Sequence, residues 1–247
     1  MSTGDNGFVL ICAAFVFFMT PGLAFFYGGL VRRKNIVNTI MACVGIMGLS
    51  VVMWIVCGFS LSFGADHGGI IGGLEYICLN GLDFNEALSY APTLSSLTYV
   101  VFQMMFAMIT PALITGAVAG RMRYKALFLF IALWSLVVYY PMAHMVWGAG
   151  GLLAEMGAVD FAGGNVVHIS SGVSGLVLAI LLGRRRGGEN TTNWVHKIPP
   201  VLLGAGIFWV GRVGINARLV LGANGVDAHA FFTSGPSSAN ALLDGML

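Results

Sequence analysis

Charged residues are scarce in this chain, and their scarcity excludes a soluble globular fold. Of the 247 residues, 9% are charged and 57% are hydrophobic, whereas roughly a quarter of the residues in an average soluble domain are charged. A fold in water cannot bury so large an apolar fraction, but the hydrocarbon layer of a bilayer accepts it directly. The composition therefore predicts an all-α integral membrane protein that crosses the bilayer several times.

The chain also lacks a cysteine framework and a basic leader. It has four cysteines. Cys12, Cys43 and Cys57 fall in apolar segments, where cysteine acts as a small packing residue, and Cys78 has no obvious partner. Residues 1–6 contain no basic residue, whereas a secretory signal begins with a positive region. We therefore interpret the first apolar segment as a membrane span and not as a removable leader.

Motifs for catalysis and nucleotide binding are missing as well. The sequence has no nucleophile–base set and no cluster of metal-ligand residues, and its few G-x-G strings fall in loops or small-residue spans. We expect that the protein is not an enzyme, that it needs no cofactor or metal, and that it does not bind nucleic acid.

Long apolar runs dominate what is present. A helix needs roughly 20 mostly apolar residues to cross the hydrocarbon layer, and six segments meet that requirement within one membrane domain, 1–247. The predicted spans are residues 7–30, 36–63, 95–119, 126–147, 165–182 and 199–217, with a weak seventh at 228–247. Pro141 is expected to kink the fourth span. The glycines between residues 68 and 73 predict a flexible start to the loop after the second span.

Lys and Arg are concentrated in alternate loops. The loops after the first, third and fifth spans hold ten of the twelve Lys and Arg residues, and the loops after the second and fourth hold none. Because positively charged loops stay in the cytoplasm, we predict a plasma-membrane protein whose N-terminus lies outside, together with the acidic loops.

Two ionisable residues stand out near the fifth span. His168 lies a few residues inside it, where a titratable group is costly and needs a reason. Either it is hydrogen-bonded to a neighbouring helix, or it lines a pore and can accept or relay a proton. The small residues at 170–175 favour a place in the bundle interior. Asp160 shortly precedes the span and can cap its N-terminus.

Aromatic residues supply two further candidates. Phe102 and Phe106 are four residues apart on the third span and so share one helix face. Such a pair is either core packing or a hydrophobic gate in a pore, and the spacing fits both. Trp147 ends the fourth span, where tryptophan usually anchors a helix at the membrane interface.

Several strings together resemble the ammonium transporter (Amt/Mep/Rh) family, and its bacterial and archaeal members more than the Rhesus proteins. They are PGLAFFYGG at 21–29, FQMMFA at 102–107, AHMVWG at 143–148, and DFAGG at 160–164 followed by His168. The resemblance implies eleven helices in two inverted five-helix repeats and a homotrimer with one pore per subunit. This chain would hold the first repeat and the start of the second.

The resemblance also implies roles. Trp147 and Phe106 would recruit ammonium at the outer face, with Asp160 as structural support. Phe102 and Phe106 would form the gate, and His168 would be one of two histidines in a hydrophobic conduit. The implied function is nitrogen uptake by ammonium or ammonia transport after deprotonation, with a PII-type signal protein as a possible cytoplasmic partner.

The sixth span departs from the family pattern. That pattern reads approximately GWFGFNAGS, and residues 211–219 read GRVGINARL. Ile215 replaces the second gate phenylalanine and Leu219 the recruitment serine, while Arg218 near an entrance would repel a cation. The family also continues for five more helices. Truncation, divergence and an imperfect record of the tail each explain this, and we favour truncation with some divergence of the tail. The alternatives to transport are a non-conducting ammonium sensor and an inactive fragment.

Overall fold

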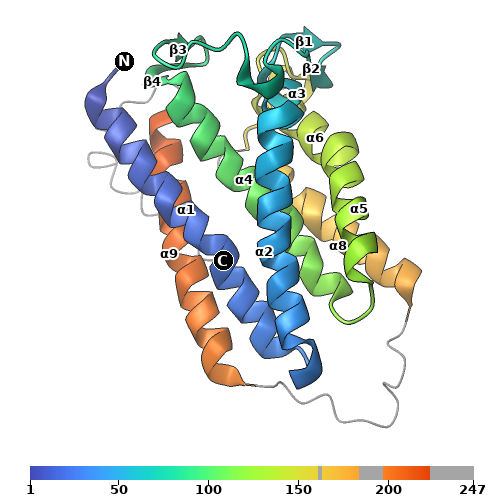
Figure 1. The fold of residues 1–247 in the computed structure, drawn as a ribbon. Helices are drawn as coiled ribbons and strands as arrows, with labels where there is room; N and C mark the ends of the chain where they lie inside the picture. Colours follow the sequence, from blue (N-terminus) through green and yellow to red (C-terminus); the bar gives the residue numbers. More distant parts are fainter. Residues whose placement is uncertain (161–162, 184–196, 223–247) are drawn as a thin grey trace.

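The computed structural model describes residues 1–160, 163–183 and 197–222, with the side chains of the last segment described as far as residue 215. The predicted seventh span and the side chains of Arg218 and Leu219 lie outside the described residues. The described chain is a bundle of long helices with small strands at one end (Figure 1).

Within the described residues, six helical units are long and apolar enough to cross a membrane. Their ends differ from the predicted ones by five residues or fewer. They are α1 (Thr3–Leu30); α2 (Ile36–Met53) with η2 (Trp54–Gly58) and α3 (Phe59–Phe63); α4 (Ser96–Val118); α5 (Tyr124–Trp134) with η4 (Ser135–Tyr139) and α6 (Tyr140–Trp147); η5 (Gly164–Ile169) with α8 (Ser170–Leu182); and α9 (Ile198–Gly222). Shorter helical turns are η1 (Arg33–Asn35), η3 (Ile77–Leu79) and α7 (Leu152–Glu155).

Serine residues begin two of the long helices. The Ser2 hydroxyl accepts the backbone N–H of Asp5 at 3.3 Å, and the Ser95 hydroxyl accepts that of Thr98 at 3.2 Å. Each hydroxyl satisfies one of the N–H groups that a helix start leaves without a carbonyl partner. These caps hold α1 and α4 at the same end of the bundle, next to β4 (Ala91–Ser95).

Three of the spans contain a π-helical turn: η2, η4 and η5. In η4 the Tyr140 N–H reaches back five residues to the Ser135 carbonyl. Pro141 follows directly, and because proline has no N–H it cannot make the next helical bond. The proline for which a kink was predicted is therefore directly preceded by a wider turn, a feature that often marks functional segments.

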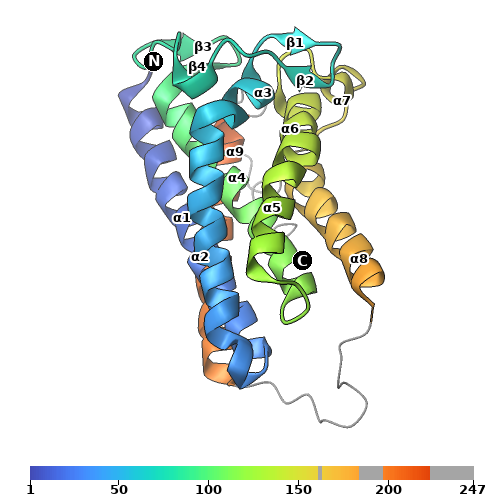
Figure 2. The same cartoon turned by 45° about the vertical axis from the view of Figure 1, so that its right-hand side comes forward.

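Helix α4 is the most buried of the six units. It packs against α1, α2 and α8, and α9 lies along α1 on the other side (Figures 1 and 2). The largest buried side chains come from α4 and the helices that surround it; they include Trp54, Phe59, Phe102, Phe106 and Ile109. The core is thus built around α4, which also carries the predicted gate.

The loop after α3 contains two small antiparallel sheets that the all-α prediction did not include. Strand β1 (Asp66–His67) pairs with β2 (Ile71–Gly72), and β3 (Ala87–Leu88) pairs with β4. Gly68 and Gly69 make the first turn with φ values of 71° and 74°, a conformation that glycine adopts without strain. The predicted flexible segment is instead an ordered hairpin, because its glycines serve a tight turn.

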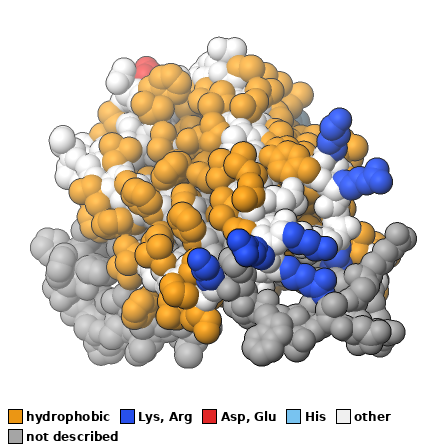
Figure 3. Space-filling model, turned by 60° about the horizontal axis from the view of Figure 1, so that its bottom comes forward, with side chains coloured by type: hydrophobic (Ala, Val, Ile, Leu, Met, Phe, Trp, Pro, Cys, Tyr) orange, Lys and Arg blue, Asp and Glu red, His pale blue; other side chains and the backbone are white. Residues whose placement is uncertain are grey.

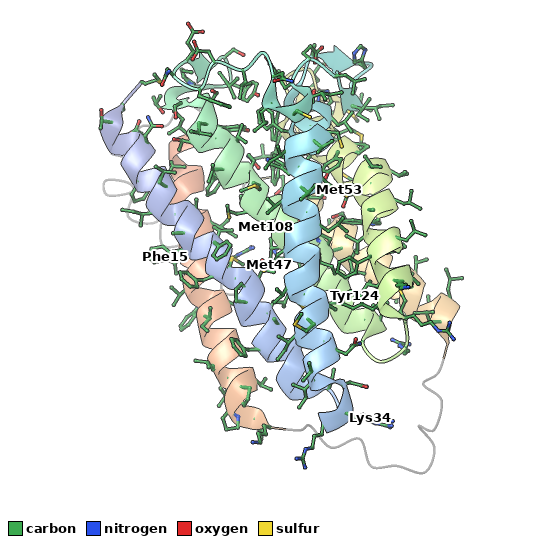
Figure 4. The ribbon with its side chains drawn as sticks, in the orientation of Figure 1. Phe15, Lys34, Met47, Met53, Met108 and Tyr124 are labelled. Carbon is green, nitrogen blue, oxygen red and sulfur yellow. The ribbon has the colours of Figure 1, made fainter. Side chains whose placement is uncertain are left out.

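Apart from Arg212, whose side chain contacts His168 on η5, the described Lys and Arg residues lie at the end opposite these hairpins. Lys34 marks that end (Figure 4), and Figure 3 shows Lys and Arg side chains gathered over it. The bundle therefore has one basic end and one end with acidic loops, which is the distribution that the alternating loops predict. Arg184, Arg185 and Arg186 lie outside the described residues.

Candidate functional site

Three aromatic rings form a column between α4 and α6. The Phe102 and Phe106 rings are 5.2 Å apart and the Phe106 and Trp147 rings 5.6 Å apart, both in edge-to-face geometry. Phe102 is 0% exposed and Phe106 is 1% exposed. The spacing of four places both phenylalanines on one face of α4, and the third ring comes from the end of α6. The structure thus brings together three of the predicted residues.

Asp160 joins this column to the start of η5. Its backbone carbonyl accepts the Trp147 indole N–H at 3.0 Å. Its carboxylate accepts the backbone N–H groups of Gly164 at 2.6 Å, Asn165 at 2.9 Å and Val166 at 3.0 Å. These are the donors that a helix start leaves unpaired, and a carboxylate there also meets the positive end of the helix dipole. One residue therefore fixes both the tryptophan and the η5 start.

His168 lies on η5 and is half-buried. Its Nε2 is 2.7 Å from Nη1 of Arg212 on α9. A guanidinium group donates hydrogen bonds and accepts none, so the histidine nitrogen is the acceptor. The sequence analysis raised two interpretations of His168, a bond to a neighbouring helix and a lining role. The structure shows that the first is present, and its partner Arg212 was not predicted.

His168 also borders a cavity of about 590 Å³ between α1, α4 and α8. Its walls consist mostly of small and aliphatic residues together with Tyr27. The Tyr27 hydroxyl donates a hydrogen bond to the Leu113 carbonyl at 3.0 Å. The lining residues are Tyr27, Leu30, Val31, Leu113, Gly116, Ala117, Ala119, His168, Ser171, Gly172, Gly175, Leu176 and Ala179.

Ile215, the remaining predicted gate residue, is 2% exposed and belongs to the same hydrophobic core as Phe102 and Phe106. It lies on α9 one turn beyond Arg212. The smaller branched side chain keeps the position apolar, although it has no aromatic ring face for a cation.

The sequence did not predict the pairing of His144 with Asp66. The fully buried His144 ring places Nδ1 3.1 Å from the Ser62 carbonyl oxygen and Nε2 2.9 Å from Oδ1 of Asp66. Both partners are acceptors, so a neutral ring satisfies one of them and an imidazolium satisfies both. The partners are about 80 residues away in sequence, and no spacing rule joins them.

This contact changes the titration of Asp66. The hydrogen bond from His144 is the main cause that holds the pKa of the Asp66 carboxyl below its ordinary value, and the Gly69 N–H, 2.7 Å from Oδ1, adds to it. Desolvation opposes both effects. The pair ties the β1–β2 hairpin to α6, the helix that ends in Trp147.

The chemistry of the site follows from its parts. Aromatic ring faces attract cations, and the buried phenylalanines below Trp147 make the passage of a bare ion costly because no water replaces its hydration shell. Beyond them stand one imidazole and a mostly apolar cavity.

Comparisons with known proteins agree with this description. Residues 7–247 match the Ammonium Transporter Family. The chain is 44% identical over 242 residues to the ammonium transporter of Bacillus subtilis and 43% identical over 241 residues to ammonium transporter Amt1 of Archaeoglobus fulgidus. Each alignment covers 98% of this chain and 59% of the relative, so the chain spans less than two thirds of their length.

The fold gives the same result. The crystal structure of Mep2 from Candida albicans matches with a TM-score of 0.79 at 30% identity, covering 87% of this chain and 48% of that one. The predicted fold class, a helical membrane protein with the ammonium-transporter fold, is confirmed by this match and by the six apolar helices. By its sequence and by its fold, the chain belongs to the ammonium transporter family.

Proposed function

We propose that the chain forms part of a membrane passage for ammonium nitrogen. Ammonium binds at the acidic-loop end against Trp147 and Phe106, loses its proton, and passes the gate of Phe102, Phe106 and Ile215 as ammonia. It then meets His168 and enters the cavity between α1, α4 and α8. The observation that carries the proposal is the three-ring column, because it joins a cation-attracting surface to a buried apolar constriction.

Binding as a cation followed by passage as a neutral molecule gives selectivity for ammonium over potassium. Ammonium and potassium are similar in size and charge, so a simple cation site discriminates poorly between them. Ring faces attract both ions, but ammonium alone can give up a proton and continue as a neutral molecule. The apolar constriction then rejects the ion that keeps its charge, since a bare ion pays a large desolvation penalty there.

Asp160 supports the recruitment site in this proposal. It accepts the Trp147 indole N–H through its carbonyl and caps η5 through its carboxylate. The tryptophan ring is thereby held beside Phe106 before substrate arrives. A site that is ordered in advance loses less conformational freedom on binding.

The orientation and assembly belong to the same proposal. Because basic loops stay in the cytoplasm, the hairpin end and the N-terminus face outward across the plasma membrane. The subunits form a homotrimer, and a PII-type signal protein binds at the basic end. The chain spans 59% of the length of the two relatives named above. We therefore assign to it only the part of the conduit that its own residues line.

Ammonium uptake into proteoliposomes tests the proposal. We expect uptake above protein-free vesicles. Phe106→Leu should reduce it about tenfold because the cation loses one ring face at a desolvated site, and His168→Ala should reduce it as well. Phe17→Leu on α1 is the matched control, since Phe17 is 42% exposed on the bundle surface.

Two other outcomes contradict the transport proposal. Ammonium binding that depends on Phe106, without any uptake, would identify a sensor. The absence of both binding and uptake would identify an inactive fragment.

A further inference from the structure

A charged side chain from α9 contacts the histidine of the proposed conduit. Arg212 Nη1 lies 2.7 Å from Nε2 of His168, and both residues are half-buried.

The contact fixes the protonation of His168. A guanidinium group has five N–H donors and no acceptor, so Nε2 must present a lone pair. A neutral imidazole has one N–H, which then resides on Nδ1. An imidazolium would direct an N–H at the guanidinium and face a like charge at hydrogen-bond distance. While the contact persists, His168 cannot take up a proton at Nε2 and cannot relay one through it.

The Arg212 guanidinium is a positive charge beside His168. The Asp160 carboxylate interacts electrostatically with both Arg212 and His168, and it also accepts three backbone N–H groups at the start of η5. Helices α4 and α8 contain no charged residue, and the only charged residue of α1 is Asp5 in its first turn. A proton added to Nε2 of His168 would therefore lie beside a guanidinium in surroundings of low polarity.

We infer that Arg212 holds the His168 imidazole as the neutral Nδ1–H tautomer and so prevents a proton from following ammonia through Nε2. This inference rests on the proposed function and deepens it. The N–H bond of ammonium breaks at the outer end, the proton goes to water there, and the ammonia lone pair is left free. Ammonia alone passes, so no net charge crosses the membrane.

The tautomer is tested without any transport assay. The full chain, labelled with ¹⁵N-histidine and reconstituted in lipid bilayers, gives the His168 signals by difference from His168→Gln. We expect Nε2 without a proton and Nδ1 with one at neutral pH. Arg212→Met should populate the Nε2–H tautomer, whereas Arg123→Met, which removes an exposed arginine from the loop between α4 and α5, should not. Protonated Nε2 in the unaltered chain, or an unchanged tautomer in Arg212→Met, would overturn the inference.

The blocked proton relay is tested by current and uptake together. In vesicles on a solid support, the unaltered chain should take up ammonia with little current. Arg212→Met should raise the ammonium-evoked current about tenfold or more, because Nε2 can then relay a proton. Equal currents in both chains would contradict the blocked relay. Absence of uptake in both would contradict the proposed function, and the tautomer signals would then decide the role of Arg212.

Discussion

Two helix seams that are both rich in small residues have opposite structures. Along the α1–α9 seam the backbones touch: a Cβ added to Gly204 would lie 2.5 Å from the Gly22 carbonyl oxygen. Along the α4–α8 seam a Cβ on Gly175 would lie 3.2 Å from the Ala117 side chain, a tight contact but not one with backbone, and a Cβ on Gly172 would meet nothing within 4 Å.

The difference shows that small residues alone do not determine how closely two helices approach. Glycines on α1 and α9 occur opposite one another, so each backbone enters the space that the other leaves, as in close helix pairs within membranes. On α4 and α8 the small residues line the cavity beside His168. The same residue types thus allow close backbone packing between α1 and α9 but line a cavity between α4 and α8.

The largest effect is expected from filling the closed seam. Gly204→Leu places a side chain against the backbone of α1 at Gly22 and Phe26. Backbone atoms cannot move aside as a flexible side chain can, so we expect a loss of about 3 kcal/mol or more of stability. Thermal unfolding in detergent measures this loss. Gly206→Leu is the matched control on the same helix, because a Cβ there meets nothing within 4 Å. Equal melting temperatures for the two variants would contradict the close approach of α1 and α9.

A smaller effect is expected at the start of η5, which leads into the open seam. Asp160→Ala removes the acceptor of three backbone N–H groups, and we expect a loss of about 1 to 2 kcal/mol, as for other helix caps. Glu155→Ala, an exposed acid on α7, should leave the midpoint unchanged. The same unfolding assay compares the two variants. An unaltered midpoint in Asp160→Ala would show that the Asp160 carboxylate does not stabilise the start of η5.

The pH dependence of stability tests the hairpin end of the bundle, where Asp66 contacts His144. The pKa of Asp66 is lowered in the folded protein, mainly by the hydrogen bond from His144. Ionised Asp66 therefore contributes fully to the stability of the folded protein above the ordinary carboxyl pKa, about 4. This contribution disappears as the pH falls through the lowered pKa that Asp66 has in the folded protein. Asp66→Asn should lower the melting temperature by a few degrees at neutral pH, and the two chains should converge in acid. A difference that persists unchanged in acid would exclude this linkage.

The smallest effect on stability is expected from the open seam itself. Gly172→Leu enters the cavity without a clash, so the melting temperature should stay close to that of the unaltered chain. Ammonium uptake should fall about tenfold, because the added side chain narrows the space beyond His168. Gly48→Leu on α2, also with nothing within 4 Å, controls for added bulk at an exposed position. Normal uptake in Gly172→Leu would show that the cavity is not on the path.

Much of the fold follows from residues that are close in sequence. Apolar runs predict the six spans and basic loops predict their ends, because the bilayer sets both length and charge. The spacing of Phe102 and Phe106 likewise predicts a shared face, which the structure confirms. Asp160 could be placed near a helix start for the same local reason.

The rest depends on contacts between distant segments. Arg212 and His168 are separated by 44 residues, and His144 lies 78 residues from Asp66. Neither pair has a pattern that sequence spacing reveals, since each is created only when separate helices pack. The hairpin at Gly68 and Gly69 was missed for another reason: glycine permits both a loose loop and a tight turn, and composition does not choose between them.

The π-helical turns also have a consequence for how such chains change over time. A π turn holds one residue more than the α turn it replaces, so each one behaves like a single-residue insertion absorbed inside a helix. Deletion of one residue within η5 would restore a regular helix and leave the flanking side chains facing as before, whereas the same deletion in a regular helix rotates the preceding side chains by about 100°. A gap of one position at η5 is therefore a change that the helix absorbs and that substitution alone does not imitate.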